Sequence, residues 1–82
     1  MTRQDVMNKV IEIVRPFVKD SAALSTVTAK TSILDDLKVN SARLVDIVLA
    51  FEDEFDIEVE DEDADRVETI GDATELVFAK VA

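Results

Sequence analysis

Cysteine, histidine, tyrosine and tryptophan are all absent from this 82-residue chain. Without cysteine there is no disulfide and no thiol nucleophile, and without histidine there is no imidazole to act as a general base or as a zinc ligand. The acidic stretch from Asp53 to Glu68 lacks the glycine and the ligand spacing of an EF-hand loop. Catalysis would rest on carboxylates, lysines and hydroxyls alone, so we expect neither an enzyme nor a metal site.

Glycine and proline occur only once each, which is too few for a sandwich or a barrel with many tight turns. The hydrophobic fraction of 48% is ordinary for a folded domain. The chain has no internal repeat and no linker-like stretch. These features predict one all-helical domain that spans residues 1–82 and is near the lower size limit for a single core.

Long apolar runs are also missing, and the first residues, Met1 to Asp5, lack the apolar core of a signal peptide. We therefore expect a cytoplasmic protein without stable membrane insertion, and we expect it to be a monomer.

Basic residues are scarce: nine Lys and Arg stand against 19 Asp and Glu, for a formal charge of −10. The segment from Asp46 to Asp65 holds eleven carboxylates and no Lys or Arg. Such a field repels nucleic acid and anionic lipid and favours partners with basic patches. A solvated acidic face with no specific partner remains the alternative for this segment.

Hydrophobic periodicity and capping signals predict a first helix that begins with Thr2 and Asp5 as a weak capping box. Its apolar positions form two adjoining stripes, and Pro16 should either kink the helix or end it just before the proline. The stretch from Ser21 to Ser32 is rich in Ser, Thr and Ala and predicts a long loop. The stripes are Val6, Val10, Ile13 and Phe17, and beside them Met7, Ile11, Val14 and Val18.

Three more helices are predicted after this loop. One follows Asn40 and runs to Phe55, with an apolar face at Leu44, Val48, Phe51 and Phe55 that Ile47 widens. Ile57 and Val59 alternate with acids but have no plausible pairing partner, so they predict an extended connector. A short helix is expected over Asp61 to Arg66, and the last helix begins after Thr69 and Asp72, a second capping pair.

Ser41 is the residue that points to a function. Asn40 is a good N-cap, so Ser41 falls at the first helical position, exposed and beside the positive end of the helix dipole. A phosphate ester would be well placed there.

The residues around Ser41 resemble the acyl carrier protein family. The family pattern is Leu-Gly-x-Asp-Ser-Leu followed by a helix that ends Glu-Glu-Glu-Phe; here it reads Leu37-Lys-Val-Asn-Ser-Ala42 and ends Glu52-Asp-Glu-Phe55. The resemblance runs from about Val27 to Val77. It implies a small four-helix bundle with a long loop between helices 1 and 2 and a short helix 3. It also implies a free-standing carrier that holds acyl groups as thioesters on a covalent phosphopantetheine arm at Ser41.

The same resemblance implies partners and further site residues. A phosphopantetheinyl transferase would install the arm, and acyl-loading, condensing or acyl-transfer enzymes of fatty-acid or specialised lipid synthesis would dock through basic patches. The expected docking residues are Asn40, Ala42, Arg43, Val45, Asp46, Leu49, Glu52 and Asp53. The expected acyl-chain pocket is formed by Val48, Phe51, Ile57, Val67 and Leu76.

Four departures from the family pattern lie at Lys38, Asn40, Ala42 and Arg43. Asn still caps the helix, Ala42 removes an apolar contact, and Arg43 places a cation two residues from the attachment point. These changes predict a divergent member with a dedicated partner set. Two alternatives remain open: an unmodified acidic helical adaptor, and a carrier of aminoacyl or peptidyl groups. The sequence does not reveal which group is carried.

Overall fold

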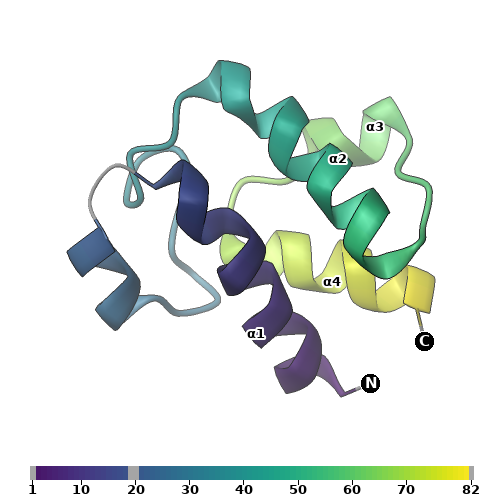
Figure 1. The fold of residues 1–82 in the computed structure, drawn as a ribbon, viewed down its shortest axis with the longest axis horizontal. Helices are drawn as coiled ribbons and strands as arrows, with labels where there is room; N and C mark the ends of the chain where they lie inside the picture. The colour runs from purple at the N-terminus through teal and green to yellow at the C-terminus, as the bar shows by residue number, and fades with distance from the viewer. Residues whose placement is uncertain (1, 19–20, 82) are drawn as a thin grey trace.

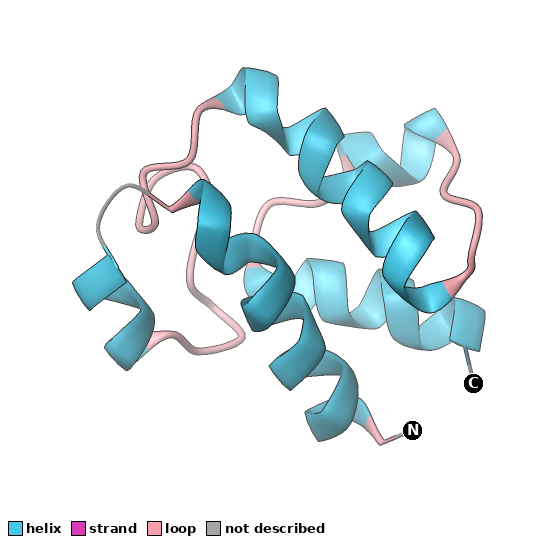
Figure 2. Ribbon diagram, in the orientation of Figure 1, coloured by secondary structure: helices cyan, strands magenta, loops and turns pink. Residues whose placement is uncertain are grey.

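The computed structural model describes residues 2–18 and 21–81, and most of these residues lie in helices (Figures 1 and 2). The four α-helices are α1 (Arg3–Val14), α2 (Leu44–Phe55), α3 (Asp61–Asp65) and α4 (Ile70–Val81). The fold is therefore the all-α four-helix bundle that was predicted, with a long connection between α1 and α2 and a short α3.

The core lies where α1, α2 and α4 meet, with α1 packed mainly against α4 and also against α2. It consists almost entirely of aliphatic side chains, and burying each one contributes roughly 1.5–3 kcal/mol before conformational entropy is counted. Among the residues that the structure describes, the one fully buried aromatic ring belongs to Phe51 of α2. The other fully buried hydrophobic side chains are Val6, Val10, Val14, Ile33, Leu37, Ile47, Ile70, Ala73 and Val77.

Helix α1 begins and ends as its sequence predicts. The Thr2 hydroxyl accepts a hydrogen bond from the Asp5 amide at 3.1 Å, and the Asp5 carboxylate accepts one from the Thr2 amide at 3.2 Å, which completes the capping box. The α-helix stops at Val14, and a 3₁₀ turn, Arg15–Phe17, continues around the proline. Of the two predicted outcomes at Pro16, the structure shows the helix ending before it.

The connection from α1 to α2 differs from the prediction in one part. The stretch from Ser21 to Ser32 was expected to be a loop throughout, but Ser21–Thr26 forms a 3₁₀ helix. Ser25 and Thr26 donate their hydroxyls to the carbonyls of Ala22 and Ala23, three residues earlier. These local bonds stabilise short helical turns, which hydrophobic periodicity does not detect.

Backbone hydrogen bonds hold the second half of this loop against the connection from α3 to α4. The Ile33 amide donates to the Glu68 carbonyl at 3.0 Å, the Ile70 amide to Thr31 at 3.0 Å, and the Gly71 amide to Ala29 at 2.8 Å. We call this set of main-chain bonds the loop clamp. Because Ile33 and Leu37 are also fully buried, the chain reaches the start of α2 by a defined path.

The connections that flank α3 agree with the prediction. Asp56 adopts a left-handed conformation (φ 53°) that ends α2, the residues from Ile57 to Glu60 form no helix or strand, and Glu60 is extended. The start of α4 carries the second predicted capping pair, in which Thr69 accepts from the Asp72 amide at 3.0 Å and Asp72 accepts from the Thr69 amide at 3.1 Å.

Candidate functional site

Ser41 lies at the beginning of a 3₁₀ turn, Ser41–Arg43, which leads directly into α2. The side-chain oxygen of Asn40 accepts a hydrogen bond from the Ala42 amide at 2.9 Å, and the backbone carbonyl of Asn40 accepts one from the Arg43 amide at 2.8 Å. The predicted cap is thus confirmed, although the first turn is 3₁₀ rather than α-helical. Ser41 itself is exposed, so its hydroxyl is accessible to another protein.

Two other serines hold their hydroxyls against the backbone. The hydroxyl of Ser25 donates to Ala22 at 2.8 Å, and that of Ser32 accepts from the Asp35 amide at 3.1 Å, with Ser32 also half-buried. Ser41 lies in the turn that leads directly into α2, and the positive end of that helix suits a bulky phosphoester. The exposed hydroxyl and the capped helix start therefore fit a covalently attached phosphopantetheine at Ser41.

Lys38 supplies the sharp turn that leads to Ser41. Its backbone is left-handed (φ 57°), a conformation that glycine adopts without a steric penalty and that costs other residues roughly 1–2 kcal/mol. The next amide, that of Val39, donates to the Ile33 carbonyl at 3.3 Å, and Val39 is 4% exposed. The chain keeps the turn even though lysine stands where the family pattern has glycine.

The outward face of α2 combines apolar and acidic side chains. Val45 is 64% exposed and Leu49 53% exposed, which is unusual for large aliphatic residues in so small a domain. Asp46 and Glu52 are partly buried beside them, and Asp53 is exposed. These five residues are the docking residues that the family resemblance leads us to expect within α2.

A groove of about 380 Å³ separates α2 from α3. Its apolar side chains come from both walls, and its remaining side chains are carboxylates. The lining residues are Val45, Val48, Leu49, Glu52, Val59, Asp61, Ala64 and Asp65.

The five predicted pocket residues do not line this groove together. Only Val48 lines it, while Phe51 is fully buried in the core and Ile57 is half-buried against that core. Val67 and Leu76 line a separate hollow of about 190 Å³ near the start of α4. Val59 and Ala64 were not predicted to line a groove; the available signal was the alternation of Ile57 and Val59 with acids, because in an extended segment it puts both apolar side chains on the same side.

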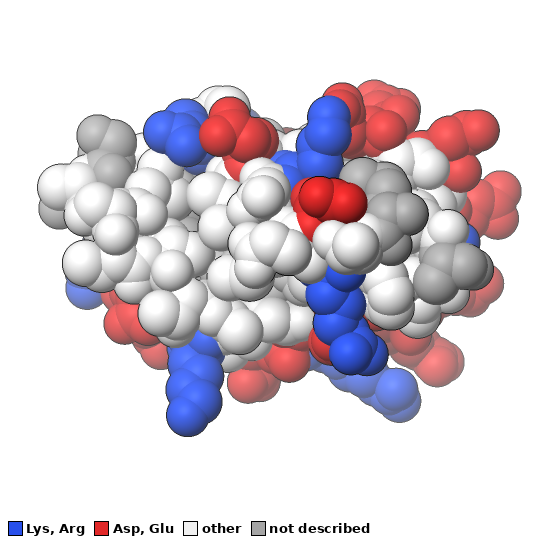
Figure 3. All heavy atoms as spheres, turned by 90° about the horizontal axis from the view of Figure 1, so that it is seen from below, with Lys and Arg blue, Asp and Glu red and all other residues white. Residues whose placement is uncertain are grey.

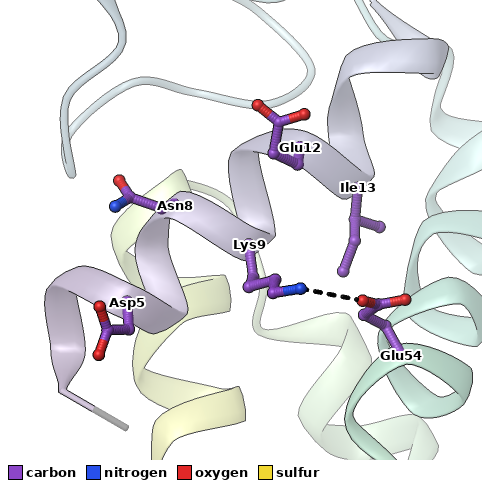
Figure 4. Close-up of a pocket in the computed structure, with 6 residues that line it drawn as sticks. All are labelled: Asp5, Asn8, Lys9, Glu12, Ile13 and Glu54. Carbon is purple, nitrogen blue, oxygen red and sulfur yellow. Dashed lines mark hydrogen bonds and ion pairs between the residues drawn. The ribbon is translucent and has the colours of Figure 1, made fainter.

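A larger hollow, of about 690 Å³, lies between α1 and the end of α2 (Figure 4). Most of its lining residues are polar or charged, and an ion pair between Lys9 and Glu54 crosses it at 3.3 Å. Glu54 is thirteen residues beyond Ser41, which corresponds to about 20 Å along a helix. The Glu54 side of this hollow is therefore well separated from Ser41.

Charge is unevenly distributed over the molecule. In the view of Figure 3, acidic side chains gather at the right edge, whereas the left half shows a broad uncharged surface with both blue and red side chains at its upper and lower margins. The Ser21–Thr26 turn, at the left end of the molecule in Figure 1, carries no charged side chain. Within the described ranges, no helix is both long enough and apolar enough to cross a bilayer.

Comparison with known families matches residues 8–77 to a family described as a phosphopantetheine attachment site. The class of protein that this fold and this match define is thus a carrier domain with a covalently attached phosphopantetheine.

Individual relatives agree with this class. The chain is 41% identical over 78 residues to an acyl carrier protein of Caulobacter vibrioides, covering 93% of this chain and all of the relative. It is 36% identical over 81 residues to one from Exiguobacterium, covering 99% of this chain and all of the relative. A solved acyl carrier protein from Enterococcus faecalis superposes with a TM-score of 0.77 at 37% identity, over 96% of this chain and 98% of that one. The chain belongs to the acyl carrier protein family.

Proposed function

We propose that Ser41 carries the phosphopantetheine arm and that the chain presents acyl groups, held as thioesters on this arm, to enzymes of fatty-acid or specialised lipid synthesis. The observation that supports this most directly is the exposed Ser41 hydroxyl at the Asn40-capped start of α2. The arm supplies the thiol, and the chain supplies the attachment point and the surface that partner enzymes recognise.

The residues of the chain have three roles in this proposal. Asn40 caps the first turn, at whose start the exposed Ser41 lies. Val45 and Leu49 provide the apolar contact for partner enzymes, and the carboxylates around them provide the attraction to basic patches. The groove between α2 and α3 takes up the first part of an alkyl chain, with Val48, Val59 and Ala64 as its apolar floor.

Intact mass tests the attachment. Incubation with a phosphopantetheinyl transferase and coenzyme A should add one phosphopantetheine to the wild type and none to Ser41→Ala. Ser25→Ala and Ser32→Ala are matched controls that should be modified like the wild type. An unmodified wild type with several transferases would favour the acidic adaptor, and modification of Ser41→Ala would overturn the assignment to Ser41.

Loading assays on the modified protein then distinguish a carrier of acyl groups from a carrier of aminoacyl or peptidyl groups. We expect malonyl and long-chain acyl groups to be loaded by the corresponding transferases and ligases, and no amino acid to be loaded by adenylating enzymes. Exclusive loading of amino acids would replace the lipid assignment and leave Ser41 as the attachment point.

A further inference from the structure

The charges around Ser41 are opposite in sign to those of the rest of α2 and α3. From Leu37 to Val45 the chain carries two cations, Lys38 and Arg43, and no carboxylate, and both cations are exposed. The carboxylates begin at Asp46 and continue without a cation to Asp65. The charge on the outward face of α2 therefore changes from positive to negative within the first turn of the helix.

Arg43 is paired with the first of these carboxylates. Its guanidinium lies 3.1 Å from the Asp46 carboxylate, and the two side chains are three residues apart on one side of the helix. Glu52 lies two turns further along and lines the α2–α3 groove, away from this ion pair. In the part of the chain that the structure describes, no cation pairs with Glu52, so a basic partner that approaches α2 meets an unpaired carboxylate there and a neutralised one at Asp46.

We propose that Arg43 withholds Asp46 from partners with uniformly basic docking surfaces and selects a partner that brings a carboxylate to the Ser41 end of α2. This inference rests on the proposed function, because it concerns the surface on which the loaded carrier docks. The docking surface of the favoured partner carries both kinds of charge. A carboxylate faces Arg43 and a basic group faces Glu52, and the apolar contacts with Val45 and Leu49 lie between them.

Because the Arg43–Asp46 ion pair is exposed to water, Arg43 can exchange Asp46 for another carboxylate. The Arg43 and Asp46 side chains are 65% and 46% exposed, so water screens the attraction and the pair contributes little to stability. A partner carboxylate can therefore replace Asp46 as the counter-ion of Arg43 at little cost. A partner lysine must instead compete with Arg43 for Asp46 and is repelled by Arg43 at the same time.

A double-mutant cycle tests whether Arg43 masks Asp46. The probe is a malonyl transferase of fatty-acid synthesis with a basic docking surface, assayed with the fully modified wild type, Arg43→Gln, Asp46→Asn and the double variant. We expect Arg43→Gln to raise kcat/KM roughly threefold at low salt, through KM rather than kcat. Asp46→Asn should have almost no effect in the wild type and should lower kcat/KM roughly threefold in the Arg43→Gln background.

Glu52→Gln is the matched control, because Glu52 is not paired with Arg43. It should lower kcat/KM by the same factor in both backgrounds, and all these effects should shrink as salt is raised. Equal effects of Asp46→Asn in the two backgrounds would overturn the masking. Unchanged melting temperatures show that the variants fold, and intact mass shows that each is modified, so failure of the proposed function would be seen before the cycle is measured.

Charge reversal on the transferase tests the partner chemistry. Basic residues of its docking patch are changed to Glu one at a time, and each enzyme is assayed with the wild type and with Arg43→Glu. We expect one reversed enzyme to prefer the wild-type carrier, while the unaltered enzyme prefers Arg43→Glu. If no reversed enzyme prefers the wild type, the proposal of a carboxylate-bearing partner fails.

Discussion

Gly71 is the residue at which the loop clamp passes closest to a helix. It is the second residue of α4, its amide donates to the Ala29 carbonyl, and a Cβ at this position would lie 2.7 Å from the same oxygen. That distance is shorter than real Cβ contacts, and the oxygen belongs to the backbone, so one of the two segments would have to move. Steric closeness, rather than a left-handed turn, requires glycine here.

Gly71→Ala is a substitution in which two effects oppose each other. Helix propensity alone would favour alanine by about 1 kcal/mol, whereas forcing a methyl group into a packed contact costs about 1–3 kcal/mol. We expect the contact to dominate, with a net loss of about 1 kcal/mol in the free energy of unfolding by urea. Amide exchange at Ile33, which donates across the clamp, should become faster. A variant that is more stable and exchanges no faster would show that the loop adjusts without strain.

At the scale of the element, α2 presents two faces with different tasks. Ile47, Val48 and Phe51 face inward and are at most 5% exposed, whereas Val45 and Leu49 face outward. The helix therefore needs its inner face to fold, and its outer apolar residues are available for partners.

Substitutions on the inner face of α2 should mainly lower stability, and substitutions on its outer face should mainly weaken the interaction with partner enzymes. Ile47→Ala should lower the free energy of unfolding by about 2–5 kcal/mol, because it leaves a cavity in the core. Leu49→Ala should change it by less than about 1 kcal/mol, because half of its surface is already in water. Among modified proteins, Leu49→Ala should still raise the KM for an acyl-loading enzyme. Equal destabilisation by both changes, in urea unfolding, would mean that Leu49 belongs to the core.

The same helix shows what its sequence could and could not predict. The spacing of apolar residues identified the buried face, and Asn40 identified the start, because both depend on short-range geometry. The lining of the groove between α2 and α3 was not predictable in this way. Whether Val67 and Leu76 share a cavity with Val48 depends on how α3 and α4 cross α2, and no local pattern encodes that arrangement.

At the scale of the whole molecule, charge opposes compactness. The formal charge is −10, and eleven carboxylates fall within the segment that forms most of α2 and all of α3. Their repulsion in the folded state is larger than in the expanded chain, so folding is weakened at low ionic strength.

Salt should therefore stabilise the protein at neutral pH. Raising sodium chloride from about 0.01 M to about 0.3 M shortens the screening length from about 30 Å to about 6 Å, and we expect the melting temperature to rise by several degrees. The rise should nearly disappear close to the sequence pI of about 4.2, where the net charge is small. Calorimetry at the two pH values checks this. An equal rise at both would point to preferential exclusion of salt from the surface rather than to screening.

The loop clamp also bears on how far this chain can diverge from its relatives. Its hydrogen bonds join main-chain atoms of Ala29, Thr31 and Ile33 to those of Glu68, Ile70 and Gly71, so they do not depend on which side chains those residues carry. Substitutions can therefore accumulate at exposed residues of the loop clamp, such as Ala29 and Glu68, while the backbone keeps its path to Ser41. Position 71 is the exception, since any side chain there meets the Ala29 carbonyl.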